Sequence, residues 1–328
     1  MKSLHSIFQK LIIAMAIAAG WPVAGLAQEY PAKPVRIVVG YAAGGTTDII
    51  ARVIAMHLTK TMGQPVIVDN RPGAGGNVGT DQVAKAAPDG YTLVLGTAGT
   101  MTVNPWIYKN MPFDTVKDFQ PVSLIATLPN LMVVHPKVPA KTVQEFVAWA
   151  KKQPGKVFFA SSGNGNTPHM TAELFNLTTG LSMEHVPYKG SSPALTDLIG
   201  GSGVQVMFDN MPSAIGHARS GALRAIAVTG PKRVESEPNI PTVSESGYPD
   251  FQVVTWFGLF APAGIPGPIL ERLNREVVEA VRNPDVKKRL IELGAEPSAN
   301  SPSEFAQLVK TERERWGKVV KTANIQGS

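Results

Sequence analysis

The segment that decides the fold is VRIVVGYAAGGTTDIIARVIAMHL, residues 35–58. It opens with a short run rich in β-branched residues, which predicts a strand over Val35–Val39. A glycine-rich loop follows, and beyond it apolar residues recur at the three- and four-residue spacing of one helix face. Thr46 or Thr47 is the predicted N-cap of that helix. Strand, glycine loop and helix in this order form the repeating unit of an α/β protein.

The same alternation continues along most of the chain and predicts an α/β fold with largely parallel sheets. Thr142 with Glu145, and Ser301 with Glu304, have the spacing of capping boxes, so each pair marks the start of a helix. Three helices are predicted near the C-terminus, over residues 268–282, 284–293 and 302–323.

Two nearby strands, 123–127 and 131–135, are predicted on either side of Leu128-Pro129-Asn130, and a long strand is predicted over 251–260. We interpret these strands as paired crossovers between two lobes. Predicted lobe 1 comprises residues 28–127 plus 252–328, and predicted lobe 2 comprises residues 128–251. Two crossovers form a hinge, and the cleft between the lobes is the expected ligand site.

The composition excludes several classes of protein. The 328 residues include no cysteine, which rules out disulfides, iron–sulfur clusters, thiolate zinc sites and thiol nucleophiles. The formal net charge of +6 suits an anionic partner, but no stripe of basic residues with interleaved aromatics indicates nucleic acid. We expect no metal and no cofactor, because H-E-x-x-H is missing and the dinucleotide pattern G-x-G-x-x-G fails at Val78.

Residues 1–27 have the pattern of a secretory signal. The apolar run from Leu11 to Ala19 is shorter than the roughly 20 residues that span a membrane, and small residues suit cleavage after Ala27. An uncleaved membrane anchor is the alternative interpretation. Because the chain has no cysteine to carry a lipid anchor, we expect an exported protein that diffuses freely in a periplasm.

Three glycine-rich loops each follow a predicted strand and precede a predicted helix, at residues 41–48, 73–77 and 161–167. A helix N-terminus carries unpaired N–H groups and about half a positive charge, and glycine lets backbone approach a ligand closely. Such loops can bind a carboxylate without a cationic side chain, and these loops contain no lysine or arginine. The alternative is that the glycines only form tight turns.

Several segments together resemble the tripartite tricarboxylate transporter receptors, also called the Bug or TctC family. They are residues 31–39 (PAKPVRIVV), 43–48 (AGGTTD), 70–76 (NRPGAGG), 88–93 (PDGYTL), 186–190 (VPYKG) and 208–209 (FD). The resemblance spans essentially the whole chain after the predicted signal. It implies a type II periplasmic binding protein, a two-lobed Venus flytrap that delivers an organic acid to membrane transporter subunits.

In that family, the first and third loops hold a ligand carboxylate, largely through backbone N–H groups and bridging waters. The positions implied here are Tyr41, Ala43, Gly44, Gly45, Thr46, Ser161, Ser162, Gly163, Asn166 and Thr167. Asp209 matches the cleft-facing acid of the family, and capping of the following helix is its alternative role. His169 lies just beyond the third loop, where it orients that loop or touches the ligand.

We therefore expect a monomeric periplasmic receptor, without enzymatic activity, for a small carboxylate. An organic acid, an aromatic acid and an acidic amino acid are all compatible, because backbone donors recognise a carboxylate and not what it is attached to. A ligand sensor for a two-component system has the same fold and cleft and stays open. An exported α/β hydrolase is the weaker alternative, because the chain has no G-x-S-x-G nucleophile motif.

Overall fold

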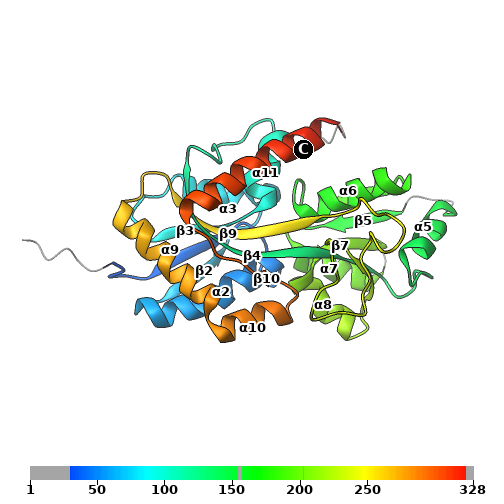
Figure 1. Cartoon of the computed structure of the whole chain (residues 1–328). Coiled ribbons are helices and arrows are strands. Elements are labelled where there is room, and N and C mark those ends of the chain that lie inside the picture. Colours follow the sequence, from blue (N-terminus) through cyan, green and yellow to red (C-terminus); the bar gives the residue numbers. More distant parts are fainter. Residues whose placement is uncertain (1–29, 154–156, 202, 323–328) are drawn as a thin grey trace, which may run out of the picture. The chain divides into compact units, whose positions relative to one another are not determined.

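A computed structural model describes residues 30–322 apart from 154–156 and 202. The predicted signal, residues 1–27, lies outside the described residues, and the compact unit begins at Lys33. Strands and helices alternate along this unit (Figure 1), which confirms the predicted α/β class. No helix in the described ranges is long and apolar enough to cross a membrane.

The strands are β1 (Val35–Val39), β2 (Val66–Asn70), β3 (Thr92–Thr97), β4 (Phe119–Val134), β5 (Phe158–Ser161), β6 (Glu184–Pro187), β7 (Val206–Asn210), β8 (Arg224–Val228), β9 (Val254–Pro262) and β10 (Glu296–Pro297). The helices are α2 (Thr46–Met62), α3 (Asn77–Ala84), α4 (Asn104–Ile107), α5 (Val143–Lys151), α6 (Thr167–Thr179), α7 (Ser191–Gly200), α8 (Met211–Arg219), α9 (Gly267–Arg282), α10 (Pro284–Glu292) and α11 (Pro302–Thr322), with a 3-10 turn η1 (Ala74–Gly76) and a π-helical turn η2 (Gly99–Val103).

The first strand, loop and helix form as predicted, with one difference at the helix start. β1 pairs in parallel with β2 and β3 and is almost wholly buried. The N-cap of α2 is Gly45, and Thr46 is its first helical residue. The two predicted capping boxes are present: Thr142 accepts a hydrogen bond from the Glu145 N–H, and Ser301 accepts one from the Glu304 N–H. The three C-terminal helices end within one residue of their predicted bounds.

The prediction of largely parallel sheets is wrong, because antiparallel pairs are as important as parallel ones in this mixed sheet. The strand order of the sheet is β2-β1-β3-β9-β4-β7-β5-β6, with β8 and β10 also paired to β4. Its two parallel parts, β2-β1-β3 and β7-β5-β6, are joined through β4 and β9, which run antiparallel. Figure 1 shows these two long strands side by side across the middle of the molecule. β4 pairs with β9 as far as Pro129 and with β7 from Asn130 onward.

The prediction of two strands over 123–127 and 131–135 is wrong, because β4 is a single strand of 16 residues. Leu128-Pro129-Asn130 has the composition of a turn. Proline lacks a backbone N–H, but β4 accommodates Pro129 at the point where its pairing passes from one neighbour to another. The change of partner at this point is where a hinge is expected, and the predicted lobe boundaries stay predictions.

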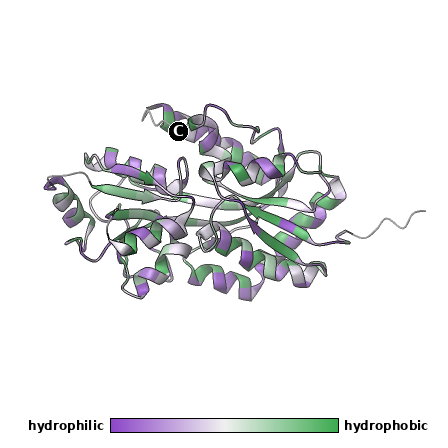
Figure 2. Ribbon diagram, turned by 180° about the vertical axis from the view of Figure 1, so that it is seen from behind, coloured by the Kyte–Doolittle hydropathy of each residue, from purple (hydrophilic) through white to green (hydrophobic). Residues whose placement is uncertain are grey.

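Figure 2 shows mostly hydrophobic residues along the central strands, whereas hydrophobic and hydrophilic residues alternate along the helices. In α9, for example, Leu273 and Val277 are buried while Arg275 and Glu279 are exposed. The aromatic cluster of β5, α6 and β7 includes Phe159, Phe175 and Phe208, all fully buried. Burial of these apolar residues fixes where the strands end, and therefore where the loops that follow the strands lie.

Helix α11 packs across η2, α4 and β4. Its Trp316 and Val320 share an apolar cluster with Ile107 of α4 and Met170 of α6. This cluster therefore joins residues of predicted lobe 1 to the helix that follows the third glycine loop.

Candidate functional site

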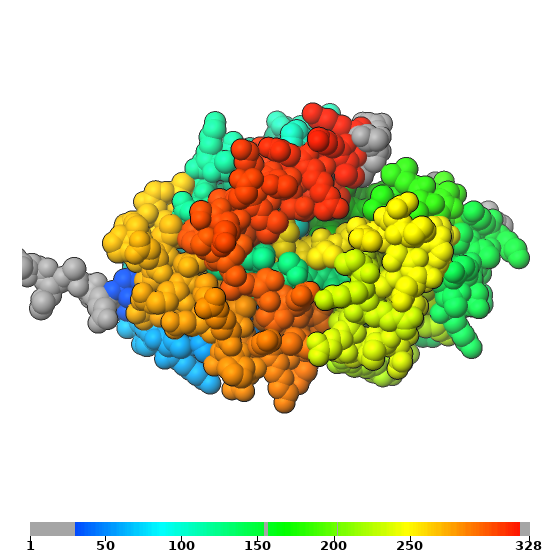
Figure 3. All heavy atoms as spheres, viewed as in Figure 1, coloured from blue at the N-terminus to red at the C-terminus, as the bar shows by residue number. Residues whose placement is uncertain are grey.

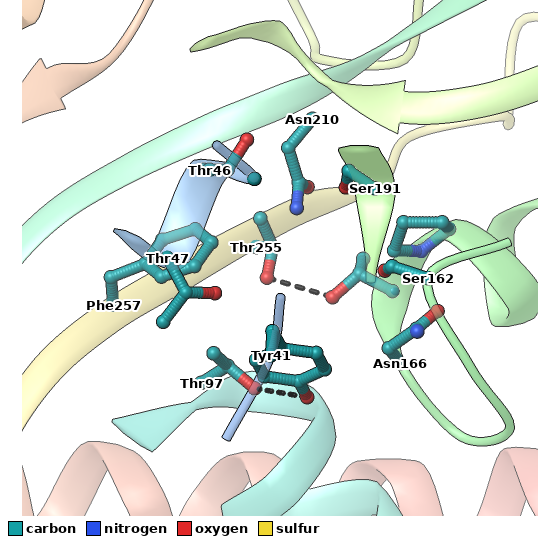
Figure 4. Close-up of a pocket in the computed structure, with 13 residues that line it drawn as sticks. Tyr41, Thr46, Thr47, Thr97, Ser162, Asn166, Ser191, Asn210, Thr255 and Phe257 are labelled. Carbon is teal, nitrogen blue, oxygen red and sulfur yellow. Dashed lines mark hydrogen bonds between the residues drawn. The ribbon is translucent and has the colours of Figure 1, made fainter. Parts of the chain in front are cut away.

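One pocket lies where four helices begin (Figure 4). Its lining residues are Tyr41, Gly45, Thr46, Thr47, Thr97, Ser162, Asn166, Thr167, Pro168, Ser191, Asn210, Thr255 and Phe257. They include the N-caps or first residues of α2, α6, α7 and α8. We call it the helix-end pocket. Each helix start directs unpaired N–H groups and the positive end of the helix dipole outward, so four such ends converging make a field that favours an anion.

The lining is polar but carries no charged side chain among these described residues. Most of its hydroxyl and amide side chains are nearly inaccessible; Thr46, for example, is 2% exposed. Two buried amide atoms on the wall have no hydrogen-bond partner, the Nδ2 of Asn166 and the Oδ1 of Asn210. Since buried polar atoms are nearly always paired, two orphans on one pocket wall indicate partners supplied by a ligand or by water.

The walls of the helix-end pocket are in direct contact with each other. The hydroxyl of Thr46 lies 2.9 Å from that of Ser213, and the hydroxyl of Thr167 lies 2.7 Å from that of Thr255. Nearby, the Ala42 N–H donates to the Lys189 carbonyl at 3.1 Å. The cavity volume is only about 20 Å³, which is room for about one or two water molecules. The walls therefore leave little space between them.

In the first loop, the turn before α2 is held by Asp48. The Gly44 N–H donates to its carboxylate at 2.9 Å, and Arg52 forms an ion pair with it one turn later. Burial opposes ionisation of Asp48, but the hydrogen bonds from Arg52 and Gly44 outweigh it and lower the pKa of the carboxyl. The Gly44 N–H is thus used within the loop, and the exposed Ala43 and Gly44 do not line the helix-end pocket.

In the third loop, two histidines hold the backbone from behind. The Nε2 of His185 lies 2.6 Å from the Ser161 hydroxyl, and the Nδ1 of His169 accepts the Gly165 N–H at 3.1 Å. The two imidazole rings stack with centroids 3.9 Å apart, and Phe159 stacks on His185. His169 therefore orients the loop and does not line the pocket, which is one of its two predicted roles.

Asp209 is fully buried and lies behind the pocket wall. Its Oδ1 accepts the Ser191 hydroxyl at 2.7 Å, and its Oδ2 accepts the Ser213 hydroxyl in a short contact. Burial raises the pKa of Asp209 to about 6, although the hydrogen bonds from Ser213 and Ser191 act in the opposite direction. Asp209 is not a lining residue, and its hydrogen bonds reach the pocket through Ser191, which is one.

The second glycine loop lines a neighbouring cavity of about 170 Å³. Tyr41 and Ser162 border both cavities. The Tyr41 hydroxyl donates to the Gly75 carbonyl at 3.0 Å, so the first loop also holds the second. Lys189 is the one basic residue lining this second cavity among the described residues.

A separate groove of about 510 Å³ lies behind the paired strands. We call it the back groove. It is lined by residues 127–129 of β4, Val254 of β9, the segment 230–235, and residues of α10 and β10. Figure 3 shows this face, with the segment after residue 230 (yellow) and α10 (orange) on either side of the hollow.

The structure places half of the predicted ligand residues on the helix-end pocket. They are Tyr41, Gly45, Thr46, Ser162, Asn166 and Thr167. Gly163 lines the second cavity, and the remaining five lie outside both: Ala43, Gly44, Ser161, His169 and Asp209. Of the nearby aromatic residues, Phe257 lines the pocket, Tyr188 lines the second cavity and Trp256 lies in the core.

Sequence reasoning missed Ser191, Asn210, Thr97 and Thr255. Ser191 follows Gly190, whose φ is +146°, and opens a helix, so the strand–glycine–helix rule applied once more would have found it. Thr97 and Thr255 lie on strands that meet the pocket only through the pairing of the sheet. Within the described residues, no group of His, Asp or Glu is arranged to hold a metal ion.

The fold and the pocket define a two-lobed periplasmic binding protein with a small, uncharged, donor-rich site. Residues 50–325 match the model of the tripartite tricarboxylate transporter family receptor, and the chain belongs to this family. Its members are periplasmic solute-binding receptors, and the related structures are those of solute-binding proteins.

Three relatives illustrate the likeness. Protein BugT of Bordetella pertussis is 39% identical over 296 residues, covering 90% of each chain. A Rhodopseudomonas palustris protein solved with adipate is 38% identical with a TM-score of 0.88, covering 91% of this chain and 99% of the other. MatC from Rhodopseudomonas palustris, solved with malate, is 36% identical with a TM-score of 0.84, and the match covers 89% of this chain and 100% of MatC.

Proposed function

We propose that this receptor captures a small carboxylate in the helix-end pocket and passes it to a membrane transporter of the tripartite tricarboxylate type. The convergence of four helix N-termini on a pocket without a charged lining side chain carries the proposal. Oriented N–H groups stabilise a carboxylate there without a basic residue. The adipate and malate bound by two related structures support the same class of ligand.

The residues proposed to contact the ligand are those that line the pocket, with the N–H groups of the first turns of α2 and α6 in the leading role. Asn166 is central, because its unpartnered Nδ2 supplies a donor at the start of α6. Ala43, Gly44, Ser161 and His169 are proposed to shape the two loops instead. Bridging water fits the pocket, since one or two molecules fill its closed volume.

Ligand entry requires the walls to separate, because a cavity of about 20 Å³ does not admit an organic acid. We propose a hinge where β4 changes partners between Pro129 and Asn130, with lobes 28–127 plus 252–328 and 128–251 moving about it. The contacts Thr46–Ser213 and Thr167–Thr255 would then form on closure.

A ligand panel tests the binding step. Thermal melts and calorimetry would use adipate, malate, aspartate, citrate and benzoate, each beside its neutral amide. We expect at least one acid to raise the melting temperature by several degrees at about 100 times its Kd, and its amide to have no effect. A panel in which no acid binds, or in which acid and amide bind equally, would contradict the carboxylate assignment.

Cellular experiments test export and delivery. If the signal is cleaved after Ala27, N-terminal sequencing of the exported protein should begin at Gln28. Deleting the gene should abolish uptake of the radiolabelled acid found in the panel, and a plasmid copy should restore it. Unchanged uptake, with a changed transcriptional response to the same acid, would instead support a ligand sensor.

A further inference from the structure

We propose that binding of a carboxylate in the helix-end pocket is coupled to uptake of one proton by Asp209, which acts as a positioning residue through Ser191 and Ser213. This inference rests on the proposed function and goes beyond it, because it says how affinity depends on pH and which residue sets that dependence. The geometry of three hydroxyl groups carries it.

With Asp209 ionised, both serine hydrogens are committed. A carboxylate only accepts hydrogen bonds, so Ser191 donates to Oδ1 and Ser213 donates to Oδ2. Ser191 also lines the pocket and then offers only lone pairs toward a ligand. Thr46 lies 2.9 Å from Ser213. Because the Ser213 hydrogen is already used, Thr46 must be the donor in that contact, and it too offers lone pairs to the pocket.

A proton on Asp209 reverses these bonds. Protonated at Oδ1, the acid donates to Ser191 and frees the Ser191 hydrogen for the pocket. Protonated at Oδ2, it donates to Ser213, whose hydrogen can turn to Thr46 or to the Asn210 carbonyl, 3.0 Å away. When it turns to Thr46, the Thr46 hydrogen is released into the pocket. Either way, one lining hydroxyl changes from acceptor to donor, which is what a ligand carboxylate requires.

Charge favours the same coupling. A ligand carboxylate and the Asp209 carboxylate would share one buried site, where two like charges disfavour double ionisation. Within the described residues, no lysine or arginine lies within ion-pair distance of Asp209. The surrounding helices carry other ionisable groups: Asp48 paired to Arg52 on α2, Asp197 bonded to Tyr188 on α7, and His217 and Arg219 in the last turn of α8. β4 presents Leu131 opposite Asp209 in the sheet.

The free protein is poised for this uptake, since burial already places the pKa of Asp209 at about 6. At pH 7, Asp209 is then mostly ionised before binding, and a ligand that raises its pKa further draws a proton from solution. The affinity for the carboxylate should therefore increase by up to about tenfold as the pH falls from 8 to 7. His185, which lies behind the third loop, does not contribute in this range, because burial lowers its pKa to about 3.

Calorimetry in phosphate and in Tris at pH 7 tests the coupling, because the two buffers release a proton with different heats. The probes are adipate and malate, which are fully ionised at this pH. We expect wild-type protein to take up about 0.5 to 1 proton per ligand, and Asp209→Asn to bind without uptake. The asparagine side chain has the shape of the aspartate and always donates to one of the two serines. The Kd of the Asp209→Asn variant should therefore also be independent of pH.

Glu276→Gln is the matched control. Glu276 is a buried carboxylate on α9, paired with Arg272 and absent from the pocket lining, so its replacement should leave the uptake unchanged. The pH profile of the wild-type Kd supplies a second readout that needs no variant. Binding without proton uptake, or equal uptake by Asp209→Asn, would overturn the coupling alone. A lack of binding by both acids in both buffers, together with a panel in which no other acid binds, would overturn the coupling together with the carboxylate assignment.

Discussion

The imidazole rings of His169 and His185 stack with their centroids 3.9 Å apart and their planes 11° apart. One ring comes from the first turn of α6 and the other from β6, and each bonds to a different point of the third loop, at Gly165 and Ser161. The bond at Gly165 is accepted by the Nδ1 of His169, whereas the direction of the bond at Ser161 depends on the tautomer of His185. The stack buries the His185 ring, where a positive charge is unfavourable.

Acidification should therefore weaken the fold through His185. Burial, and next the charge of His169, lower the pKa of His185 from 6.5 to about 3. The unfolded chain then binds the proton more readily, so stability is present above pH 6.5 and is lost as the pH falls from about 6.5 toward 3. Urea unfolding at pH 7.5 and pH 5 should show a larger loss for wild type than for His185→Asn. His57→Asn, a change outside the stack, should lose as much as wild type, and equal losses in all three proteins would contradict the assignment.

Asn166→Asp should separate ligand binding from folding. An aspartate caps a helix as well as an asparagine does and suits the dipole, so the bond to the His169 N–H and the melting temperature should be retained. The unpartnered donor Nδ2 becomes an anionic oxygen, and losing a charge-assisted bond of about 1.5–3 kcal/mol weakens carboxylate binding about 10- to 100-fold.

Asn283→Asp provides the matched control for that change, since Asn283 caps α10 by the same kind of bond and does not line the helix-end pocket. Calorimetry with adipate or malate should give the wild-type Kd for it. If Asn166→Asp also bound with the wild-type Kd, the end of α6 would not contact the carboxylate.

Thr255→Val should speed ligand release. Valine has the shape of threonine but removes the partner of the Thr167 hydroxyl, one of the contacts that join the pocket walls. A net loss of about 0.5–1.5 kcal/mol raises the dissociation rate about 2- to 10-fold, measured by stopped-flow displacement of adipate. Thr178→Val, at an exposed hydroxyl of α6 bonded to Leu174, should leave the rate unchanged. The same rate in both variants would show that the Thr167–Thr255 contact does not hold the closed form.

Two glycine-to-alanine changes should have opposite effects on stability. A Cβ on Gly258 of β9 would lie 2.1 Å from the Phe305 ring, so Gly258→Ala should destabilise the fold by about 1–3 kcal/mol through overpacking. A Cβ on Gly216 of α8 meets nothing within 4 Å, so Gly216→Ala should stabilise by about 0.5–1 kcal/mol. Chemical denaturation measures both, and a stabilising Gly258→Ala would contradict the packing of α11 on β9.

The sequence predicts the α/β alternation and the positions of the glycine loops because both depend on local signals. Val35–Val39 is a strand, and a helix follows the glycine-rich loop, as the run of β-branched residues and the spacing of apolar residues indicate. The single strand β4 was missed because Pro129 and Asn130 have the composition of a turn, and only the partner strands reveal that the chain runs straight through.

Side-chain roles in the site needed the tertiary structure. His169 and His185 are 16 residues apart, and nothing in their spacing shows that the ring from α6 stacks on the ring from β6. Asp209 lies near the end of β7, and its position behind Ser191 and Ser213 depends on where two different helices start. Local patterns indicate which loops meet, whereas packing decides which atoms face the ligand.

The back groove is a suitable position at which to attach a fluorescent dye to this receptor. Its walls come from both sides of the proposed hinge, with residues 230–235 facing α10 and β10 across about 510 Å³. Motion about the proposed hinge should therefore change the width of this groove. The chain contains no cysteine, so one cysteine introduced at Glu235 would take a single environment-sensitive dye. Ligand capture would then become a fluorescence signal, and the receptor a reagentless sensor for the acid it binds.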